Sequence, residues 1–497
     1  MTEPVFLHNG KPPEMAAEGV ARSDAEAINS ATFRKLYKSR VPIYPKEMDG
    51  LYRQIKWAMM ALTLSIYYLV PWIRWDRGPN APNQAVLVDM AHERLYFFFI
   101  EIWPQEVYYI TGLLILAAVS LFLINALFGR LWCGYSCPQT VWTDLFIWVE
   151  TKIEGDRAAR IRLAAAPWSM SKLAKRTAKH AVWLLFAVAT GGAWVFYFND
   201  APVLARQLLD GTAGMSNYIF IVMLTFTTYT FGGLMREQVC TYMCPWPRIQ
   251  AAMTDREALS VTYRRDRGET RGPHRKNESW EGRGDCIDCK QCVAACPMGI
   301  DIRDGAQLEC INCALCIDAC DDVMVKIGRP MGLIAFDTDA NVERRMRGEA
   351  QRFRFIRPRT VLYGAVIALV GGIMLFTFAN RHTLALDVIR DRNPAFVTLA
   401  DGAVRNGYTL KLMNRSNRAR PVMLDIEGLA VSRINVIGVG EHMPAEITVE
   451  ADKVRTVRVL VTVARGNARP GPQDVQFILS ADGERRAVEA IFVGGKP

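Results

Sequence analysis

Five long apolar segments, each free of charged residues, divide the chain before its C-terminal quarter. Each is close to the roughly 20 residues that a helix needs to cross the hydrocarbon core of a bilayer. A buried core helix is the alternative for the shortest segment, but five such runs in one chain favour a protein with several membrane-spanning helices. The expected segments are residues 57–73, 107–128, 181–198, 218–235 and 361–379.

The loops between these segments alternate in charge. Basic residues gather before the first segment and between the second and third, whereas the loops after the first and third are mainly acidic. The positive-inside rule therefore predicts a cytoplasmic N-terminus, a cytoplasmic region between segments four and five, and an exported C-terminus. We expect a multi-pass protein of the bacterial inner membrane, with the first segment as an uncleaved anchor. The basic residues are Arg34, Lys35, Lys38, Arg40, Lys46, Arg53, Lys56, Arg130, Lys152, Arg157, Arg160, Arg162, Lys172, Lys175, Arg176 and Lys179.

Composition agrees with this topology. Hydrophobic residues make up 51% of the 497 residues, and the formal net charge is +10. Basic cytoplasmic loops account for that charge, so no nucleic-acid partner is expected. All twelve cysteines fall on the predicted cytoplasmic side or at that membrane face, where a reducing compartment preserves thiols.

The pattern changes after about residue 384, where apolar and polar residues alternate in short runs separated by turn-forming residues. Such alternation is typical of strands with one buried face. A tail with strands at this spacing predicts a periplasmic β-sandwich of the immunoglobulin type. The clearest expected strands are residues 408–413, 445–449, 454–461 and 475–479.

Eight cysteines occur between the fourth and fifth segments in two runs of identical spacing, C-x2-C-x2-C-x3-C. This is the ligand pattern of bacterial ferredoxins with two 4Fe-4S clusters, in which the fourth cysteine of each run binds the other cluster. We predict that the first cluster is bound by Cys286, Cys289, Cys292 and Cys320. The second is then bound by Cys310, Cys313, Cys316 and Cys296.

Zinc sites and a disulfide framework are the alternatives for these eight cysteines. Zinc sites rarely use three thiols at successive x2 spacing and a fourth at x3, and disulfides do not persist in a reducing compartment. The second run departs from the pattern, because Cys320 is followed by Asp321 where Cys296 is followed by proline. We expect this departure to affect the local backbone and the cluster potential more than iron binding.

The remaining four cysteines form an internal repeat, C-x-Y-x-C-P, at residues 133–138 and 240–245. Each copy follows a helix that is expected to end in Phe-Gly, at 128–129 and 231–232. The proline suits the first position of a new helix, which places Cys137 and Cys244 near an N-cap. The helix dipole is expected to lower the pKa of a thiol there.

After the first copy, apolar residues recur at helical spacing with polar residues opposite, which is typical of an interfacial amphipathic helix. The apolar positions are Val141, Leu145, Trp148 and Val149, and the polar positions are Asp144, Thr151 and Lys152.

If the two repeats pack together, four soft thiolates meet at the cytoplasmic membrane face. Sulfur ligands of this kind favour Cu(I), zinc or an iron-sulfur cluster. Inert buried cysteines or a structural metal clip are the alternative, because spacing alone does not report redox activity.

Two C-x3-C-P motifs among membrane helices, a two-cluster ferredoxin insert, one further helix and an exported β-sandwich resemble the CcoG family of cytochrome c oxidase accessory proteins, also called FixG or RdxA. The similarity runs from about Leu36 to the end and includes the stretch 390–394. It implies a cupric reductase that converts Cu(II) to Cu(I) during assembly of cbb-type cytochrome c oxidase. Oxidase subunits and copper transport or chaperone proteins are then the expected partners. The family's copper-handling cysteines, the candidate catalytic residues, correspond to Cys133, Cys137, Cys240 and Cys244.

Together these patterns predict an α-helical membrane protein with about five spanning helices, a cytoplasmic ferredoxin module and a C-terminal immunoglobulin-like β-sandwich. Two alternatives to the reductase stay open: a quinol-linked electron-transfer subunit of a respiratory complex, and a non-enzymatic copper-binding assembly scaffold. The expected domains are an N-terminal segment 1–53, a four-helix membrane domain 54–250, the ferredoxin-like domain 251–358, the fifth helix 359–380 and the sandwich 381–497.

Overall fold

The computed structural model describes residues 15–17, 19–29, 41–78, 81–275, 278–416, 418–441 and 444–495. Of the residues named above, Arg34, Lys35, Leu36, Lys38 and Arg40 lie outside this set. The chain forms two compact units. The first comprises residues 1–73 and 85–374, and the second comprises residues 74–84 and 375–497.

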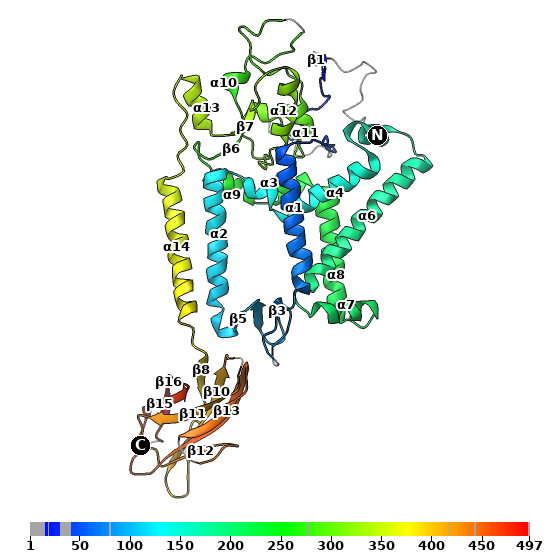
Figure 1. Cartoon of the computed structure of the whole chain (residues 1–497). Helices are drawn as coiled ribbons and strands as arrows, with labels where there is room; N and C mark the ends of the chain where they lie inside the picture. Colours follow the sequence, from blue (N-terminus) through cyan, green and yellow to red (C-terminus); the bar gives the residue numbers. More distant parts are fainter. Residues whose placement is uncertain are drawn as a thin grey trace. The chain divides into compact units, whose positions relative to one another are not determined.

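Long helices form the body of the first unit (Figure 1). Within the described residues, four stretches are long and apolar enough to cross a membrane, so the chain is a membrane protein: Pro104–Phe128, Met170–Val195, Met215–Met235 and Pro358–Ala379. They contain η2 (Pro104–Glu106), α2 (Tyr108–Phe128), α6 (Met170–Val195), α8 (Met215–Thr228), the π-helix η3 (Tyr229–Met235) and α14 (Pro358–Ala379).

The first expected segment, 57–73, is also helical, as α1 (Leu51–Leu69) and the short η1 (Val70–Trp72). Among the described residues, however, α1 is not one of the four stretches that qualify for a membrane crossing. The reason is its start, where Arg53, Gln54 and Lys56 lower the mean hydropathy.

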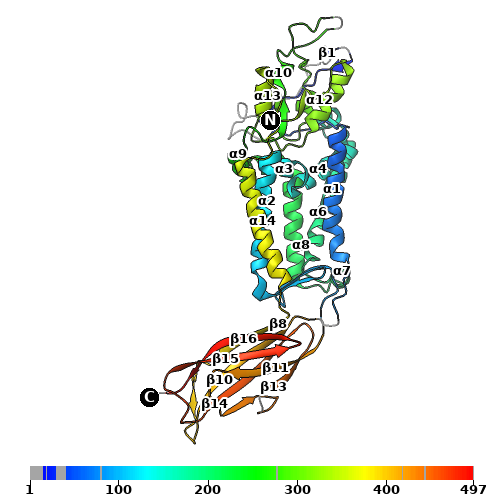
Figure 2. The same cartoon turned by 60° about the vertical axis from the view of Figure 1, so that its left-hand side comes forward.

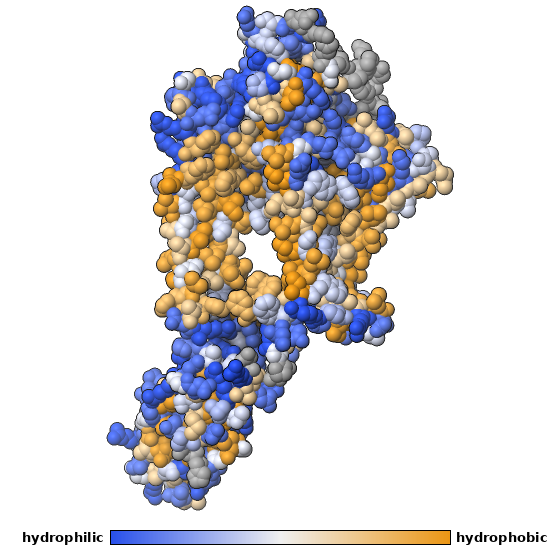
Figure 3. All heavy atoms as spheres, in the orientation of Figure 1, coloured by the Kyte–Doolittle hydropathy of each residue, from blue (hydrophilic) through white to orange (hydrophobic). Residues whose placement is uncertain are grey.

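The long helices of the first unit pack in two groups. α14 lies against α2, where Phe122 and Tyr363 have ring centroids 6.2 Å apart. α1 lies against α6 through Tyr67, whose hydroxyl donates to the Thr190 carbonyl at 2.8 Å. Figures 2 and 3 show these helices side by side and covered by hydrophobic residues, which is the surface that lipid requires.

Helix α6 begins eleven residues before the expected segment 181–198, so the basic stretch assigned to a loop is helical. The side chain of Ser169 caps the helix by accepting the backbone N–H of Lys172. Lys179 is buried, and its ammonium lies 3.2 Å from Glu150 and 2.9 Å from Glu154. These partners on a neighbouring helix allow charged residues to continue the helix without exposure to lipid.

The neighbouring helix is α4 (Pro138–Glu154), and it differs from the expected interfacial helix. Val141, Leu145 and Val149 are buried in the protein, and Asp144 on the opposite face is buried as well. Asp144 accepts two hydrogen bonds from Arg53, at 2.9 and 3.0 Å. The polar face is therefore covered at Asp144, where α1 supplies the cation, whereas Lys152 on the same face is exposed as an interfacial helix requires.

The ferredoxin region and the small sheet of β3–β5 lie at opposite ends of the long helices in the first unit (Figure 1). Asp318 in the ferredoxin region fixes the start of α1 by accepting the backbone N–H groups of Tyr52 and Arg53, at 3.2 and 2.8 Å. The ferredoxin region contains β6 (Ser260–Tyr263), α10 (Arg265–Gly268), α11 (Gln291–Ala295), η5 (Ile302–Asp304), α12 (Leu315–Lys326), β7 (Ile334–Asp337) and α13 (Asp339–Met346). The other elements of the first unit are β1 (Met15–Ala17), β2 (Val20–Ala21), β3 (Val86–Asp89), β4 (Arg94–Phe97), β5 (Ile100–Ile102), α3 (Leu131–Tyr135), α5 (Arg157–Ala165), α7 (Ala201–Leu209), η4 (Val239–Met243) and α9 (Trp246–Met253).

The second unit is a sandwich of two antiparallel sheets, which confirms the prediction of an immunoglobulin-like fold. One sheet has the order β12-β14-β10-β8, with β9 also paired to β10, and the other has the order β13-β11-β15-β16. Tyr408 and Phe477 meet between the sheets with ring centroids 4.9 Å apart. The strands are β8 (Leu384–Arg390), β9 (Val397–Thr398), β10 (Val404–Asn414), β11 (Arg420–Glu427), β12 (Arg433–Val436), β13 (Ala445–Val449), β14 (Lys453–Val463), β15 (Pro472–Ala481) and β16 (Glu484–Val493).

Candidate functional site

The first candidate cluster site is a cavity between the loop before α11 and helix α12. Four cysteines line it: Cys286, Cys289, Cys292 and Cys320. Ile287, Met324, Leu333 and Ile334 complete an apolar wall, and Arg303 adds a cation. These four thiols are the set predicted to bind one cluster, and they come from both cysteine runs.

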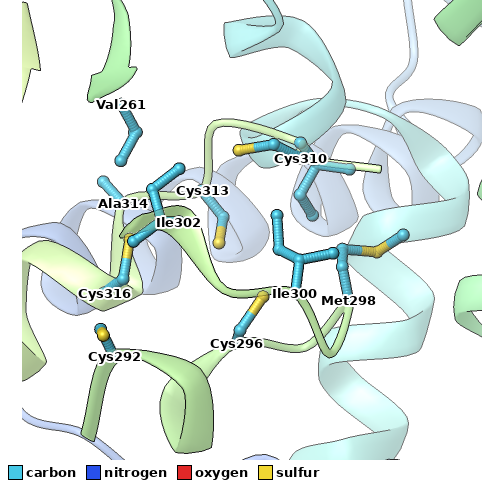
Figure 4. Close-up of a pocket in the computed structure, with 11 residues that line it drawn as sticks. Val261, Cys292, Cys296, Met298, Ile300, Ile302, Cys310, Cys313, Ala314 and Cys316 are labelled. Atoms are coloured by element: carbon cyan, nitrogen blue, oxygen red, sulfur yellow. The ribbon is translucent and has the colours of Figure 1, made fainter. Parts of the chain in front are cut away.

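The second cavity is lined by Cys296, Cys310, Cys313 and Cys316 (Figure 4). Its remaining wall is apolar and includes Val261, Ile300 and Ile302. Cys296 therefore reaches across from the first run, as Cys320 reaches across from the second. Cys292 lines both cavities, so the two sites are neighbours separated by little more than one side chain.

The two loops that carry three cysteines each have the same backbone geometry. Asp288 and Lys290 adopt positive φ values of 51° and 56° in the first loop. Asn312 and Ala314, at the equivalent positions of the second, have φ values of 53° and 63°. Left-handed residues between the cysteines bend each loop around its cavity, and here they are not glycines.

The chemistry of both cavities fits a resident iron-sulfur cluster. Burial raises the pKa of Cys296 to about 12 and that of Cys310 to about 11. Each thiol must lose its proton to bind iron, and a cluster provides the compensating positive charge that the apolar wall lacks. All eight cysteines are free thiols, so they retain this capacity.

The four C-x-Y-x-C-P cysteines also gather. Cys133 lies in α3 and Cys137 is the N-cap of α4, with Pro138 at the first helical position as predicted. Cys240 lies in η4 and Cys244 follows it directly. Burial raises the pKa of Cys240 to about 12, and negative charge on the three other thiols adds to this, which marks the four as close neighbours. We call them the thiol quartet.

The second repeat does not follow a helix that ends at Phe231-Gly232, so that prediction is wrong. Gly232 lies inside η3, which continues α8 to Met235. Gly232 and Gly233 instead provide space for the rings of Phe146 and Trp183, which lie 3.0 to 3.4 Å from where a Cβ would be. Their role is helix packing.

The two repeats match instead at the residue with positive φ that ends each helix and reverses the chain. Gly129, with φ 56°, ends the first helix four residues before Cys133, as predicted. Arg236, with φ 46°, ends the second helix four residues before Cys240. The duplicated unit is thus a helix, a left-handed residue, three residues and the thiol motif.

The first repeat is packed directly on the second cysteine loop. A Cβ on Gly134 would lie 2.6 Å from the Ile311 carbonyl oxygen, so only glycine allows this approach. The hydroxyl of Tyr135 donates to the Cys313 carbonyl at 3.2 Å. Arg130 donates to the carbonyls of Cys310 at 3.3 Å and Pro247 at 2.7 Å, which joins the loop to both repeats.

A thin wall separates the second cysteine cavity from a third, polar cavity beside the quartet. Met298 and Ile311 line both cavities, and Cys240 lines the polar one. Cys133 and Cys240 pack against the same apolar cluster as Cys296 and Cys310. The quartet and the second cluster site therefore lie next to each other.

Within the described residues, no three His, Cys, Asp or Glu side chains are close enough to hold a single metal ion. The same holds for the two sets of ferredoxin cysteines, although each set lines a single cavity. The quartet would have to contract to bind a single ion.

Three family models match the chain. A 4Fe-4S dicluster domain matches residues 235–339, a 4Fe-4S binding domain matches residues 110–154, and the immunoglobulin-like fold at the C-terminus of FixG matches residues 374–495. Nitrogen fixation protein FixG of Rhizobium meliloti is 52% identical over 95% of this chain and 97% of its own length. This chain belongs to the FixG/RdxA family.

Two further proteins are similar to parts or most of this chain. Protein RdxB of Cereibacter sphaeroides is 50% identical over 92% of this chain and 97% of its own length. A solved FixG-related protein from Vibrio parahaemolyticus is 26% identical and covers 22% of this chain and 96% of its own, with a TM-score of 0.20. As a member of the FixG/RdxA family with matched 4Fe-4S domains, the chain is an iron-sulfur redox protein of a membrane.

Sequence reasoning missed Gly134, Arg130 and Met298, which bring the quartet and the second loop together. An alignment of the two repeats on Gly129 and Arg236 would have pointed to the first two. Met298 carries no such signal, because a methionine after Cys-Pro reads as core filling.

Proposed function

We propose that this FixG-like protein is a cupric reductase, which passes electrons from two clusters to copper held by the thiol quartet. Its product, Cu(I), would be destined for a cbb-type cytochrome c oxidase, with copper transport proteins as donors or acceptors. The observation that supports the proposal is that the sites are consecutive neighbours. Cys292 lines both cluster cavities. Met298 and Ile311 separate the second cluster cavity from the cavity that Cys240 of the quartet lines.

The ferredoxin cysteines would hold the two clusters that supply the electron. We assign Cys286, Cys289, Cys292 and Cys320 to the first cluster, and Cys296, Cys310, Cys313 and Cys316 to the second. Each 4Fe-4S cluster, when bound, carries one electron at a time. The apolar walls exclude water from the thiols, and the Arg303 guanidinium, which is paired with Asp288 and Asp301, lies on the wall of the first cavity.

The quartet supplies selectivity for the reduced metal. Cu(II) prefers nitrogen and oxygen ligands, whereas thiolate sulfur favours Cu(I). A site made of Cys133, Cys137, Cys240 and Cys244 therefore raises the copper potential. One electron converts Cu(II) to Cu(I), and an external reductant restores the clusters.

The test is anaerobic Cu(II) reduction by protein in detergent, followed with a chelator specific for Cu(I). The variant C137S/C244S should lose the activity and keep about eight iron atoms per chain. The matched variant C289S should lose about four of them and slow the reaction while still binding copper. Wild-type rates in C137S/C244S would overturn the reductase and favour the scaffold function. Stoichiometric zinc without iron would overturn the cluster assignment.

A second candidate is favoured by the matched 4Fe-4S binding domain at 110–154, which contains Cys133 and Cys137 and none of the eight ferredoxin cysteines. In this alternative the quartet holds a third cluster and extends the electron path, as in a quinol-linked subunit. The same C137S/C244S variant decides: about twelve iron atoms in the wild type and about eight in the variant would establish the third cluster.

We also propose that the N-terminus and the ferredoxin region are cytoplasmic and that the sandwich is periplasmic. The distribution of cations supports this orientation. It requires α1 to cross the membrane, since four crossings would leave both ends on the same side. A reporter active only in the cytoplasm should work when fused near Arg264 and fail when fused after Ala400. Activity of both fusions would mean that α14, the long helix between the two fusion points, does not cross the membrane.

A further inference from the structure

The polar cavity beside Cys240 contains a second kind of sulfur. Met298 is 4% exposed and lines this cavity together with Cys240. Its other neighbours there include two buried or nearly buried cations, Lys56 and Arg236, and the carboxylate of Asp144. The Met298 thioether and the Cys240 thiol are both soft metal donors, and they line the same cavity as these charged side chains.

The backbone around Met298 fixes the position of this side chain. The Met298 carbonyl accepts a hydrogen bond from the side chain of Asn29 at 2.8 Å. The Met298 backbone N–H bonds to the thiol sulfur of Cys296, a ligand assigned to the second cluster. Cys296 and Met298 are thus held two residues apart on opposite sides of one tight turn.

The direction of the side chain separates it from the cluster ligands. In Figure 4, the sulfurs of Cys296, Cys313 and Cys316 gather in one region, whereas the Met298 sulfur points away from them. Because Met298 also lines the cavity of Cys240, its thioether is available on the quartet side of the wall. Core filling requires burial but does not require a sulfur atom at this place.

We propose that Met298 is a copper ligand that supplies a thioether to Cu(I) beside Cys240. The inference rests on the proposed function, because it takes the quartet as the copper site. A neutral thioether binds Cu(I) and contributes little to Cu(II), so it adds selectivity for the product. The charges of this cavity are balanced, because Lys56 and Arg236 line it together with Asp144 and Glu237, so the selectivity for Cu(I) would come from the sulfur donors. Met298 would then bind copper through its side chain and donate a hydrogen bond to the cluster ligand Cys296 through its backbone N–H.

The first test measures Cu(I) affinity of the full chain, with its clusters intact and under anaerobic conditions, by competition with a Cu(I) chelator. Met298→Leu keeps the volume, the apolar contacts and the backbone N–H. It should weaken Cu(I) binding by about tenfold to a hundredfold and leave the iron content unchanged. Met413→Leu is the matched control, because Met413 is 1% exposed in strand β10 of the sandwich, and the variant should bind Cu(I) as the wild type does.

The second test detects the bond itself. X-ray absorption at the copper edge of Cu(I)-loaded, selenomethionine-labelled protein should show a selenium neighbour, which labelled Met298→Leu should lack. Wild-type affinity in Met298→Leu, or no selenium neighbour, overturns the ligand. If C137S/C244S still binds Cu(I) like the wild type, the quartet is not the copper site, and the proposed function fails together with the ligand. If only Met298→Leu behaves as wild type, the proposed function stands and Met298 is core filling.

Discussion

The two C-x-Y-x-C-P repeats have identical cysteine spacing and different surroundings. In the first, Gly134 and the buried Tyr135 rest on the second cysteine loop. At the matching positions of the second, Thr241 donates to the Glu237 carbonyl within its own helical turn, and Tyr242 is 47% exposed. The first repeat lies in an α-helical turn and the second in a π-helical one.

This difference indicates how a duplicated unit can divide two tasks. The first copy is fixed against the part of the chain that supplies electrons. The second copy leaves Cys240 on the wall of a polar cavity, and π-helical turns of this kind are frequent at functional sites. The cysteine spacing is the same in both copies. Packing distinguishes them, because the first copy rests on the second cysteine loop and the second copy lines a cavity.

The largest effect is expected from removing the cysteines of one repeat at a time. Either C133S/C137S or C240S/C244S should abolish Cu(I) binding, because each copy supplies only half of a shared site. Equilibrium dialysis of anaerobic protein gives the stoichiometry. Partial binding by both variants would instead mean that each repeat holds its own metal, and the division of tasks would be lost.

A smaller effect is expected from Gly134→Ala. The added Cβ would meet the Ile311 carbonyl at 2.6 Å, and overpacking of this kind destabilises by about 1–3 kcal/mol. Thermal unfolding in detergent should show the loss, together with slower Cu(II) reduction. The matched change, Thr241→Ala, removes only a hydrogen bond within one helical turn and should shift stability by about 0.5 kcal/mol or less. Equal effects would show that the first repeat is not a special anchor.

The smallest effect is expected from Tyr135→Phe. It removes the hydrogen bond to the Cys313 carbonyl, a loss of about 0.5–1.5 kcal/mol. Because that carbonyl belongs to the loop of the second cluster, the potential of one cluster should also shift, which redox titration followed by electron paramagnetic resonance can resolve. Tyr242→Phe, at the 47% exposed matching position of the second repeat, should shift the cluster potential less than Tyr135→Phe does. An equal shift in both variants would remove the asymmetry.

Much of the fold follows from the sequence because its signals are local. Thiol spacing predicted the sets that the structure brings into two cavities, and alternation predicted strands such as β10 and β15. The failures occur where a distant residue decides. Asp144 is buried because Arg53 approaches from α1, and Lys179 extends α6 because Glu150 and Glu154 approach from α4.

The second repeat failed for a related reason. Phe231-Gly232 has the appearance of a helix end, but the rings of Phe146 and Trp183 occupy the space that the glycines leave. The helix therefore continues as η3 to Met235 and does not turn at Gly232. A single sequence does not reveal which partner will fill such a space, so the position of the turn at Arg236 could not be predicted.

The left-handed residues of the two cysteine loops have a consequence for maturation. Lys290 and Ala314 hold a conformation that is about 1–2 kcal/mol less favourable for an ordinary residue than its alternatives. Bound iron offsets this strain, and a chain without iron has no reason to retain it. The loops of freshly synthesised protein should therefore relax and become open to proteases. We therefore expect cluster insertion to complete the folding of the ferredoxin region, so that protein made without iron is cleaved by proteases faster than iron-loaded protein.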